Sequence, residues 1–279
     1  MKKYFLLLII ASMLIMQAPI LSAKDMDMDA LPEVEDVTKT MEQESKADWQ
    51  ATIGLGAGVV PDYEGSNDYQ AVPFPFFRVH WRSGYYMELE GLTLRANLLP
   101  NAMWKFGPVV RYRMGRSDVE DNAVDRMRDI DDSTEVGAFL KVIIDNWDAR
   151  IEAVKDVSDG HNGYLIGYYL GYSVPIDRQW RLTFGASATY ADDDYMDTFF
   201  SVDEDNSIRS GLNTYKADGG LKDVGGTVSV VYNMSKNWGV MSIVGYKRLL
   251  GDAADSPIVD EEGSADQWVA GALVTYSWY

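Results

Sequence analysis

Apolar and polar side chains alternate along most of this chain, and the segment from Trp268 to Trp278 shows the pattern most fully. Every second residue of this segment is apolar, and glycine, threonine and serine fall among the residues between them. Because successive side chains of a β-strand point to opposite faces, one face is uniformly apolar with a tryptophan at each end. Such a stripe, about ten residues long, is typical of a strand that crosses a bilayer. An edge strand of a soluble β-sandwich is the alternative interpretation.

The same two-residue period recurs from Trp49 onward. Apolar residues of one parity face glycine, polar or charged residues of the other in five further segments: 49–59, 104–113, 134–144, 164–173 and 180–190. An α-helix repeats every 3.6 residues and does not produce this pattern. The sequence therefore predicts an all-β protein.

The connections between these segments come in two sizes. Short turns fall at 145–146, 175–178 and 235–237, and long acidic loops fall at 115–133, 191–222 and 248–265. Outer-membrane barrels have short periplasmic turns and long external loops, so we place the long loops outside. Because crossings must alternate, the region between Ser83 and Ala102 must hold two short strands around Glu90-Gly91. The prediction is an antiparallel transmembrane β-barrel over 49–279, with about twelve strands (ten to fourteen) and both termini periplasmic.

The first 48 residues have a different character. Lys2 and Lys3 precede an apolar run from Tyr4 to Met16, and small residues end at Ala23, which predicts a secretory signal peptide over 1–23. No later run approaches 18 apolar residues, so a membrane role would require a barrel. Residues 24–48 are rich in Asp and Glu and contain no aromatic residue, which predicts a flexible acidic periplasmic tail. The tail is either a solubilising leader or a docking segment for a periplasmic partner.

Composition narrows the function. The formal net charge is −18, which argues against nucleic-acid binding, and the chain contains no cysteine, which excludes disulfides. Acidic clusters at 192–194, 203–205 and 260–262 could hold divalent cations that bridge lipopolysaccharide. None has the regular spacing of a calcium loop, so solvation explains them better. We expect no cofactor and no resident metal.

Charged residues on the predicted inner faces of the strands carry both signs. The candidate lumen charges that we single out are Arg78, Arg82, Lys105, Arg111, Arg113 and Glu135. They could form a structural network of ion pairs, or they could line a narrow aqueous passage. The mixture of signs favours the network or a poorly selective pore.

Catalysis has little support in the sequence. The chain has two histidines, His80 beside the inward-facing Arg78, and His161 in a glycine-rich external turn that turn chemistry explains. No serine occupies a Gly-x-Ser-x-Gly elbow. We therefore predict that the protein is not an enzyme.

Four stretches carry more specific motifs. They are 61–75, with Pro61-Asp-Tyr-Glu-Gly-Ser66 and Pro73-Phe-Pro75, then 107–116, 210–220 and 248–259. Together they resemble the MipA/OmpV family of outer-membrane proteins, the MltA-interacting proteins, across the predicted barrel. The loop residues that match the family's motifs are Pro61, Tyr63, Gly65, Ser66, Ser210, Gly211, Leu212, Gly251, Asp252, Asp255, Ser256 and Pro257.

The resemblance implies location in the outer membrane of a Gram-negative cell, in contact with its lipid and lipopolysaccharide. It implies a non-enzymatic scaffold that holds a lytic transglycosylase, a murein hydrolase, near a murein synthase. The alternatives are a small-solute channel that uses the lumen charges, and surface adhesion or stress resistance through the acidic loops. We further expect Tyr63 and Tyr69 to join an aromatic belt. Asp252, Asp255 and Ser256 lie just outside the strand that carries Lys247 and Arg248, and we expect them to fold their loop back by hydrogen bonds and ion pairs.

Overall fold

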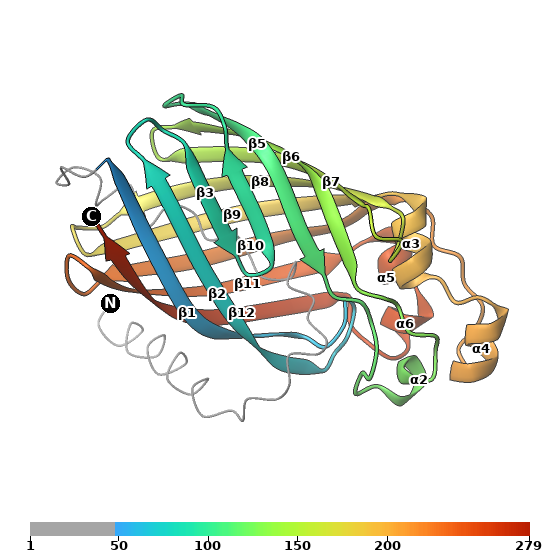
Figure 1. Ribbon diagram of the computed structural model, residues 1–279. Coiled ribbons are helices and arrows are strands. Elements are labelled where there is room, and N and C mark those ends of the chain that lie inside the picture. The colour runs from blue at the N-terminus through green and yellow to red at the C-terminus, as the bar shows by residue number, and fades with distance from the viewer. Residues whose placement is uncertain (1–47) are drawn as a thin grey trace.

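The alternating pattern is realised as twelve antiparallel strands that close into a barrel (Figure 1). The computed structural model describes residues 48–279, so the predicted signal peptide and all but the last residue of the predicted tail lie outside the described residues. The strands are β1 (Trp49–Pro61), β2 (Tyr69–Trp81), β3 (Tyr86–Glu90), β4 (Thr93–Asn97), β5 (Trp104–Arg113), β6 (Ser133–Ile144), β7 (Trp147–Asp156), β8 (Tyr164–Pro175), β9 (Trp180–Ala191), β10 (Gly220–Asn233), β11 (Trp238–Leu249) and β12 (Asp266–Trp278).

Each strand pairs with its neighbours in sequence, and the barrel closes where β1 pairs with β12 from Ala51↔Trp278 to Val59↔Ala270. The predicted barrel and its twelve strands are confirmed. The two short strands placed around Glu90-Gly91 are β3 and β4.

The two ends of the barrel differ as the loop lengths predicted. One end, called here the turn end, holds the short connections and both ends of the strand series. The opposite loop end holds five short helices (Figure 1). These are α2 (Asn122–Asp125), α3 (Asp193–Phe200), α4 (Glu204–Ser210), α5 (Gly251–Ala254) and α6 (Pro257–Asp260). Across residues 48–279, no helix has the length and apolar character needed to cross a membrane.

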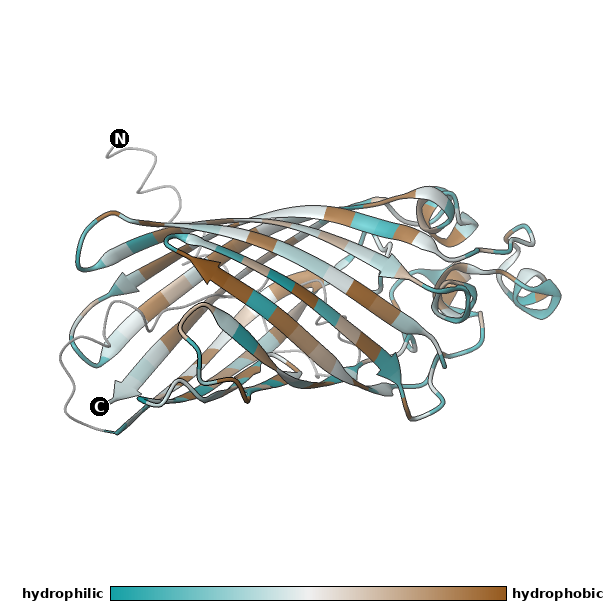
Figure 2. Cartoon of the chain, turned by 90° about the horizontal axis from the view of Figure 1, so that it is seen from above, coloured by the Kyte–Doolittle hydropathy of each residue, from teal (hydrophilic) through white to brown (hydrophobic). Residues whose placement is uncertain are grey.

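The outer surface carries an apolar band between two aromatic girdles, and apolar residues recur along the outer faces of the strands in Figure 2. The girdle at the turn end contains Trp49, Trp81, Trp104, Trp147, Trp180, Trp238 and Trp278, and the girdle at the loop end contains Tyr69, Tyr112, Tyr164, Tyr190, Tyr246 and Trp268. The ten residue-to-residue steps from Trp268 to Trp278 rise by about 33 Å along the strand. With a tilt of about 40°, the band is roughly 25 Å high, as in other outer-membrane barrels.

Apolar side chains pack together in the turn half of the interior. An apolar cluster of inward-facing side chains occupies it: Phe74, Phe76, Val231, Met241, Ile243 and Leu273. Small polar residues pair across neighbouring strands, with the Thr52 and Ser277 hydroxyls 2.9 Å apart.

Placing a charge on the apolar band should destabilise the barrel. Leu55 lies midway along β1 on the outer face and is 69% exposed, so its replacement disturbs little packing. We expect Leu55→Arg to lower the free energy of unfolding in lipid vesicles by about 2–4 kcal/mol, because the guanidinium must lose water in the hydrocarbon. Denaturant titration measures the change. Ile208→Arg is the control, since Ile208 is 84% exposed on α4 beyond the band, and an equal loss in both variants would contradict the placement of the membrane.

Candidate functional site

A network of buried ion pairs runs along the inner faces of β2 to β7 and reaches the loop end of the interior. Except for the outward Lys155, the charged residues of β2 to β7 occupy inward-facing positions, so neighbouring strands bring opposite charges together. Arg78 on β2 bonds Glu88 on β3, with 2.5 Å between Nε and Oε2. Arg95 on β4 bonds Glu152 on β7 at 2.7 Å, and it also approaches Glu90 at 3.4 Å.

Arg111 links this first part of the network to a second part around Glu135. Its guanidinium contacts Glu152 and lies 3.3 Å from Glu135, whose other oxygen accepts a 2.7 Å bond from Arg113 Nε. Glu135 is fully buried. Removing one partner from such a buried network leaves an uncompensated charge, so the pairs lock β4 to β7 in place.

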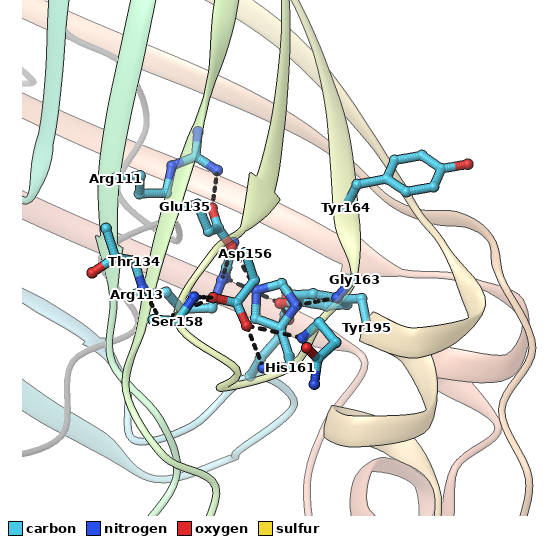
Figure 3. A network of polar contacts seen from close by, with 12 residues as sticks. Arg111, Arg113, Thr134, Glu135, Asp156, Ser158, His161, Gly163, Tyr164 and Tyr195 are labelled. Carbon is cyan, nitrogen blue, oxygen red and sulfur yellow. Dashed lines mark hydrogen bonds and ion pairs between the residues drawn. The ribbon is translucent and has the colours of Figure 1, made fainter.

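Glu135 also receives a bond from a histidine in the β7–β8 loop (Figure 3). Its Oε1 lies 3.0 Å from His161 Nε2, while the backbone N–H of Gly163 donates to His161 Nδ1 at 3.1 Å. Because Nδ1 accepts this hydrogen bond, it carries no hydrogen itself. The ring hydrogen is therefore on Nε2, which donates to Glu135. Asp156 holds the loop by accepting from the backbone N–H of His161. The turn alone therefore does not account for His161, which is buried inside the mouth.

Helix α3 closes over this histidine. Asp192 caps the helix by accepting from the N–H of Tyr195, and the Tyr195 ring meets the His161 ring edge-on at 5.1 Å. The Tyr195 hydroxyl accepts from Arg113 at 3.0 Å and donates to Glu64 at 2.8 Å. One buried phenol thus joins the network of the strands to the β1–β2 loop.

Glu64 extends the network to the other side of the barrel. It contacts Lys222 on β10, which lies 2.9 Å from Asp223, and Lys247 on β11 lies 3.7 Å from the same Glu64 oxygen. Burial by itself would raise the pKa of the Glu64 carboxyl, but Lys222, Lys247 and Arg113 outweigh it and lower the pKa to about 2. The carboxylate is therefore charged at neutral pH and holds three elements together.

Apolar clusters under the loop helices complete a cap over the mouth. One cluster contains Tyr195, Met196, Phe199, Phe200, Leu249, Ala253 and Val259, and a second contains Tyr63, Val119, Val124, Met127, Val202, Leu212 and Ile258. Arg116 is buried beside them and donates to the Phe199 carbonyl at 3.0 Å. Burial is the main influence on this guanidinium and outweighs the opposite effect of nearby Tyr63 and Asp129. The pKa of Arg116 is therefore lowered to about 10.

The motif residues of the long loops lie in this cap. Gly65 has a φ of +101°, and a side chain there would strike Val259. Its carbonyl accepts from Ser264, and Gln267 bonds both Gly65 and Ser66. These contacts join the β1–β2 and β11–β12 loops.

The other two motifs shape helices of the same cap. The Ser210 hydroxyl bonds the Asn206 carbonyl, Gly211 ends α4 with a φ of +88°, and Leu212 packs into the second cluster. Gly251 begins α5 with a φ of +50°. Ser256 caps α6, which begins at Pro257, and its hydroxyl also donates to Phe200 at 2.6 Å.

Several expected placements differ from those observed. Arg82 lies in the exposed turn after β2 rather than in the lumen, because the strand ends at Trp81. Tyr63 is buried in the cap and not in the aromatic belt.

The β11–β12 loop folds back through hydrogen bonds, one of the two kinds of contact that we expected. Lys247 faces Glu64, and Arg248 bonds Asp266. Asp252 accepts from the N–H of Asp218, and Asp255 ends α5. Hydrogen bonds to backbone groups therefore fold this loop back.

The remaining expected lumen charges do lie inside the barrel: Arg78, Lys105, Arg111, Arg113 and Glu135. Sequence reasoning missed the parts contributed by loops, which are Glu64, His161 and Tyr195. Glu64 lies within the Pro61–Ser66 motif, and this was the only available signal. Within the described residues, no group of three or more His, Asp or Glu is arranged to hold a metal ion.

A small cavity remains beneath the cap. Its volume is about 160 Å³. Charged residues line it together with Phe74, Tyr169 and Val269. The cavity can hold a few waters or one small charged group, and it lies among ion pairs that cross the interior.

Comparison with known proteins gives a consistent picture. A family model described as "MltA-interacting protein MipA" matches residues 53–278. The putative outer membrane protein YiaT of Escherichia coli K12 is 28% identical over 179 residues, which cover 63% of this chain and 67% of that protein. The outer membrane protein OmpV of Vibrio cholerae is 31% identical over 121 residues, covering 43% of this chain and 45% of that protein.

Solved structures with a related shape include the KdgM porin, with a TM-score of 0.43 and 10% identity over 82% of this chain and 99% of the porin. An outer membrane channel of Pseudomonas putida F1 has a TM-score of 0.44 and 10% identity, over 88% of this chain and 100% of that channel.

Removing the phenol that bridges Arg113 and Glu64 should loosen the cap. We expect Tyr195→Phe to lower the free energy that keeps α3 closed by about 1–3 kcal/mol, because two buried charged groups each lose a hydrogen bond. Hydrogen exchange of the amides of residues 193–200 measures it. Tyr164→Phe is the control, since Tyr164 lies on the outer girdle, and equal protection in Tyr195→Phe and the wild type would contradict the role of the hydroxyl.

Acid should also loosen the cap. A carboxyl with a lowered folded-state pKa stabilises the fold above its unfolded pKa, and this contribution disappears as pH falls through the folded value. For Glu64 the window runs from about pH 4.5 down to about pH 2. We expect amide protection at residues 193–200 to fall across this window, and Glu64→Gln to flatten the fall. An unchanged profile in that variant would assign the acid response to other groups.

Proposed function

The chain belongs to the MltA-interacting protein MipA family and is an outer-membrane β-barrel, and we propose that it is a non-enzymatic scaffold for murein enzymes. In this proposal the turn end faces the periplasm, where it binds a lytic transglycosylase and a murein synthase and keeps them close together. The family description supplies the first partner. The barrel contacts the lipid of the outer membrane and serves as the anchor.

The observation that carries this proposal is that paired and packed side chains occupy much of the interior. Ion pairs such as Arg95–Glu152 and Arg113–Glu135 cross the loop half, and the cluster around Phe76 and Met241 lies in the turn half. Helices also cover the mouth. A barrel whose interior is occupied by packed side chains is expected to act through its outer surfaces. In this proposal a periplasmic partner can reach only the turn end.

The turn end offers a surface of the right character. Leu98 and Ile176 are 61% and 59% exposed on the β4–β5 and β8–β9 turns, and Leu99, Met103 and Met234 are also exposed there. These side chains lie on three turns of the same end, where a periplasmic partner could reach them. The acidic segment 24–48 joins the barrel at the same end and is a second candidate for the docking region.

A small-solute channel is the second candidate function, and the cavity beneath the cap favours it. Conduction would require α3 and its neighbours to move off the mouth and the ion pairs to separate. Arg78, Arg111 and Arg113 would then line the passage, whereas the scaffold depends on residues of the turn end.

The scaffold can be tested by affinity capture. The refolded mature protein, with and without residues 24–48, is immobilised and exposed to solubilised envelope proteins at near-physiological salt. We expect specific retention of a murein hydrolase or a murein synthase. Loss of retention on truncation would place the docking site on the tail, and absence of both enzymes from the full protein would contradict the scaffold.

A matched pair of variants locates the surface. Leu98→Asp combined with Ile176→Asp changes the turn end, and Ile208→Asp makes the same change on the opposite end. We expect only the first variant to lose the partner, by at least about tenfold in Kd, which corresponds to 1.4 kcal/mol. Steady conductance of the same preparation in a planar bilayer, without retention of either enzyme, would favour the channel.

A further inference from the structure

The β3–β4 hairpin is too short to complete the wall of the barrel beside β2. Strand β3 pairs with β2 only from Phe76 to His80, although β2 continues to Tyr69 (Figure 1). Among the described residues, no strand pairs with this side of β2 beyond Pro75. The open stretch, named here the β2 seam, is bordered by residues 71–75 of β2, the hairpin turn 91–92 and the end of β5, where Tyr112 N donates to Leu92 O at 3.1 Å.

Two prolines remove two of the three hydrogen-bond donors that residues 71–75 would otherwise direct into the seam. Pro75 O accepts from Gly91 N at 3.0 Å, and Trp81 N donates to Tyr85 O at 2.9 Å, so residues of this parity direct their backbone groups away from β1. Pro73 shares the parity. Because proline has no N–H, neither Pro73 nor Pro75 leaves a donor unsatisfied in hydrocarbon. This explains the Pro73-Phe-Pro75 motif.

The same prolines decide what can occupy the seam. A second strand would need backbone donors from this edge of β2, and both prolines lack them. The outward side chains of Ala71, Pro73 and Pro75 are small and apolar, and the seam lies within the apolar band. The surface therefore suits an acyl chain of a membrane lipid rather than a strand of another protein.

The cavity lies directly behind the seam. Its wall includes residues from all three borders: Phe74 from β2, Glu90 and Thr93 from the hairpin, and Arg111 and Arg113 from β5. Phe74 points inward and is buried. An acyl chain that passes between β2 and the hairpin would meet this ring first.

The charge of the cavity favours an anion. Six cationic side chains face four carboxylates in its lining, and the cations are Arg95, Arg111, Arg113, Arg150, Lys222 and Lys247. Glu135, just outside the lining, pairs with Arg111 and Arg113, which leaves an excess of one cation. A net positive charge in a low-dielectric recess attracts a negative group. A volume of about 160 Å³ accommodates a compact headgroup such as a phosphate ester.

We propose that the β2 seam is a lateral binding site for an anionic lipid of the outer membrane. The acyl chain lies in the seam against Pro73 and Phe74, and the headgroup enters the cavity near Lys247 and Arg111. The site is independent of the turn end, so it stands whether or not the barrel binds murein enzymes.

Photo-labelling of the wild-type protein tests the site. The protein is reconstituted in vesicles that contain phosphatidylglycerol with a diazirine in its acyl chain, and labelled residues are mapped by mass spectrometry. We expect labelling of inward-facing Phe74 in addition to lipid-facing residues. Ser229 is the internal control, since it also faces inward but lies on β10, which is paired on both sides. Labelling confined to lipid-facing residues would overturn the proposal.

A second arm tests the headgroup. Labelling of Phe74 should be stronger with phosphatidylglycerol than with the equivalent phosphatidylcholine. Lys247→Gln should reduce this ratio about threefold, as expected for the loss of one ionic contact. Lys155→Gln is the matched control, because Lys155 lies exposed on the outer face of β7. Equal labelling by the two lipids, or an equal fall in both variants, would overturn the assignment of an anionic headgroup.

Discussion

The need to satisfy backbone hydrogen bonds in hydrocarbon is the constraint on which this structure depends. A strand edge exposed to lipid loses several kcal/mol for each unpaired polar group, and closure of β1 onto β12 removes the edge. Where closure fails, at the end of the β3–β4 hairpin, Pro73 and Pro75 reduce the number of groups that need partners. The paired wall of the barrel and the unpaired edge of β2 therefore follow from the same rule.

Closure of the barrel determines which side chains face inward. These inward side chains then determine which loop residues pack over the mouth. Inward parity brings Arg113 and Glu135 together on neighbouring strands, and these charges need further partners once they are buried. His161 and Tyr195 supply them from the β7–β8 loop and α3. Ordered loop helices at the mouth are thus a consequence of charges within the barrel, and the cap and the network stabilise each other.

The barrel with its packed cap offers three surfaces for function: the turn end, the seam and the cap itself. The scaffold proposal uses the first surface and the lipid site uses the second. The two proposals make independent demands, since Leu98 and Ile176 lie on turns at one end, while Phe74 and Lys247 lie behind the wall.

The sequence alone determined the strands, their parity and the twelve-strand topology, because a two-residue period and alternating loop lengths are local signals. It also placed Arg111, Arg113 and Glu135 on inner faces. Only the tertiary structure decided the partners of those charges, since Glu64, His161 and Tyr195 come from loops whose positions no local period encodes. It likewise decided the position of Arg82, because this depends on where β2 ends. The role of Pro73 and Pro75 also required the structure, because it depends on how far β3 extends. Pairing between distant segments is set by closure of the whole barrel. Closure involves all the strands together and cannot be read from any one segment.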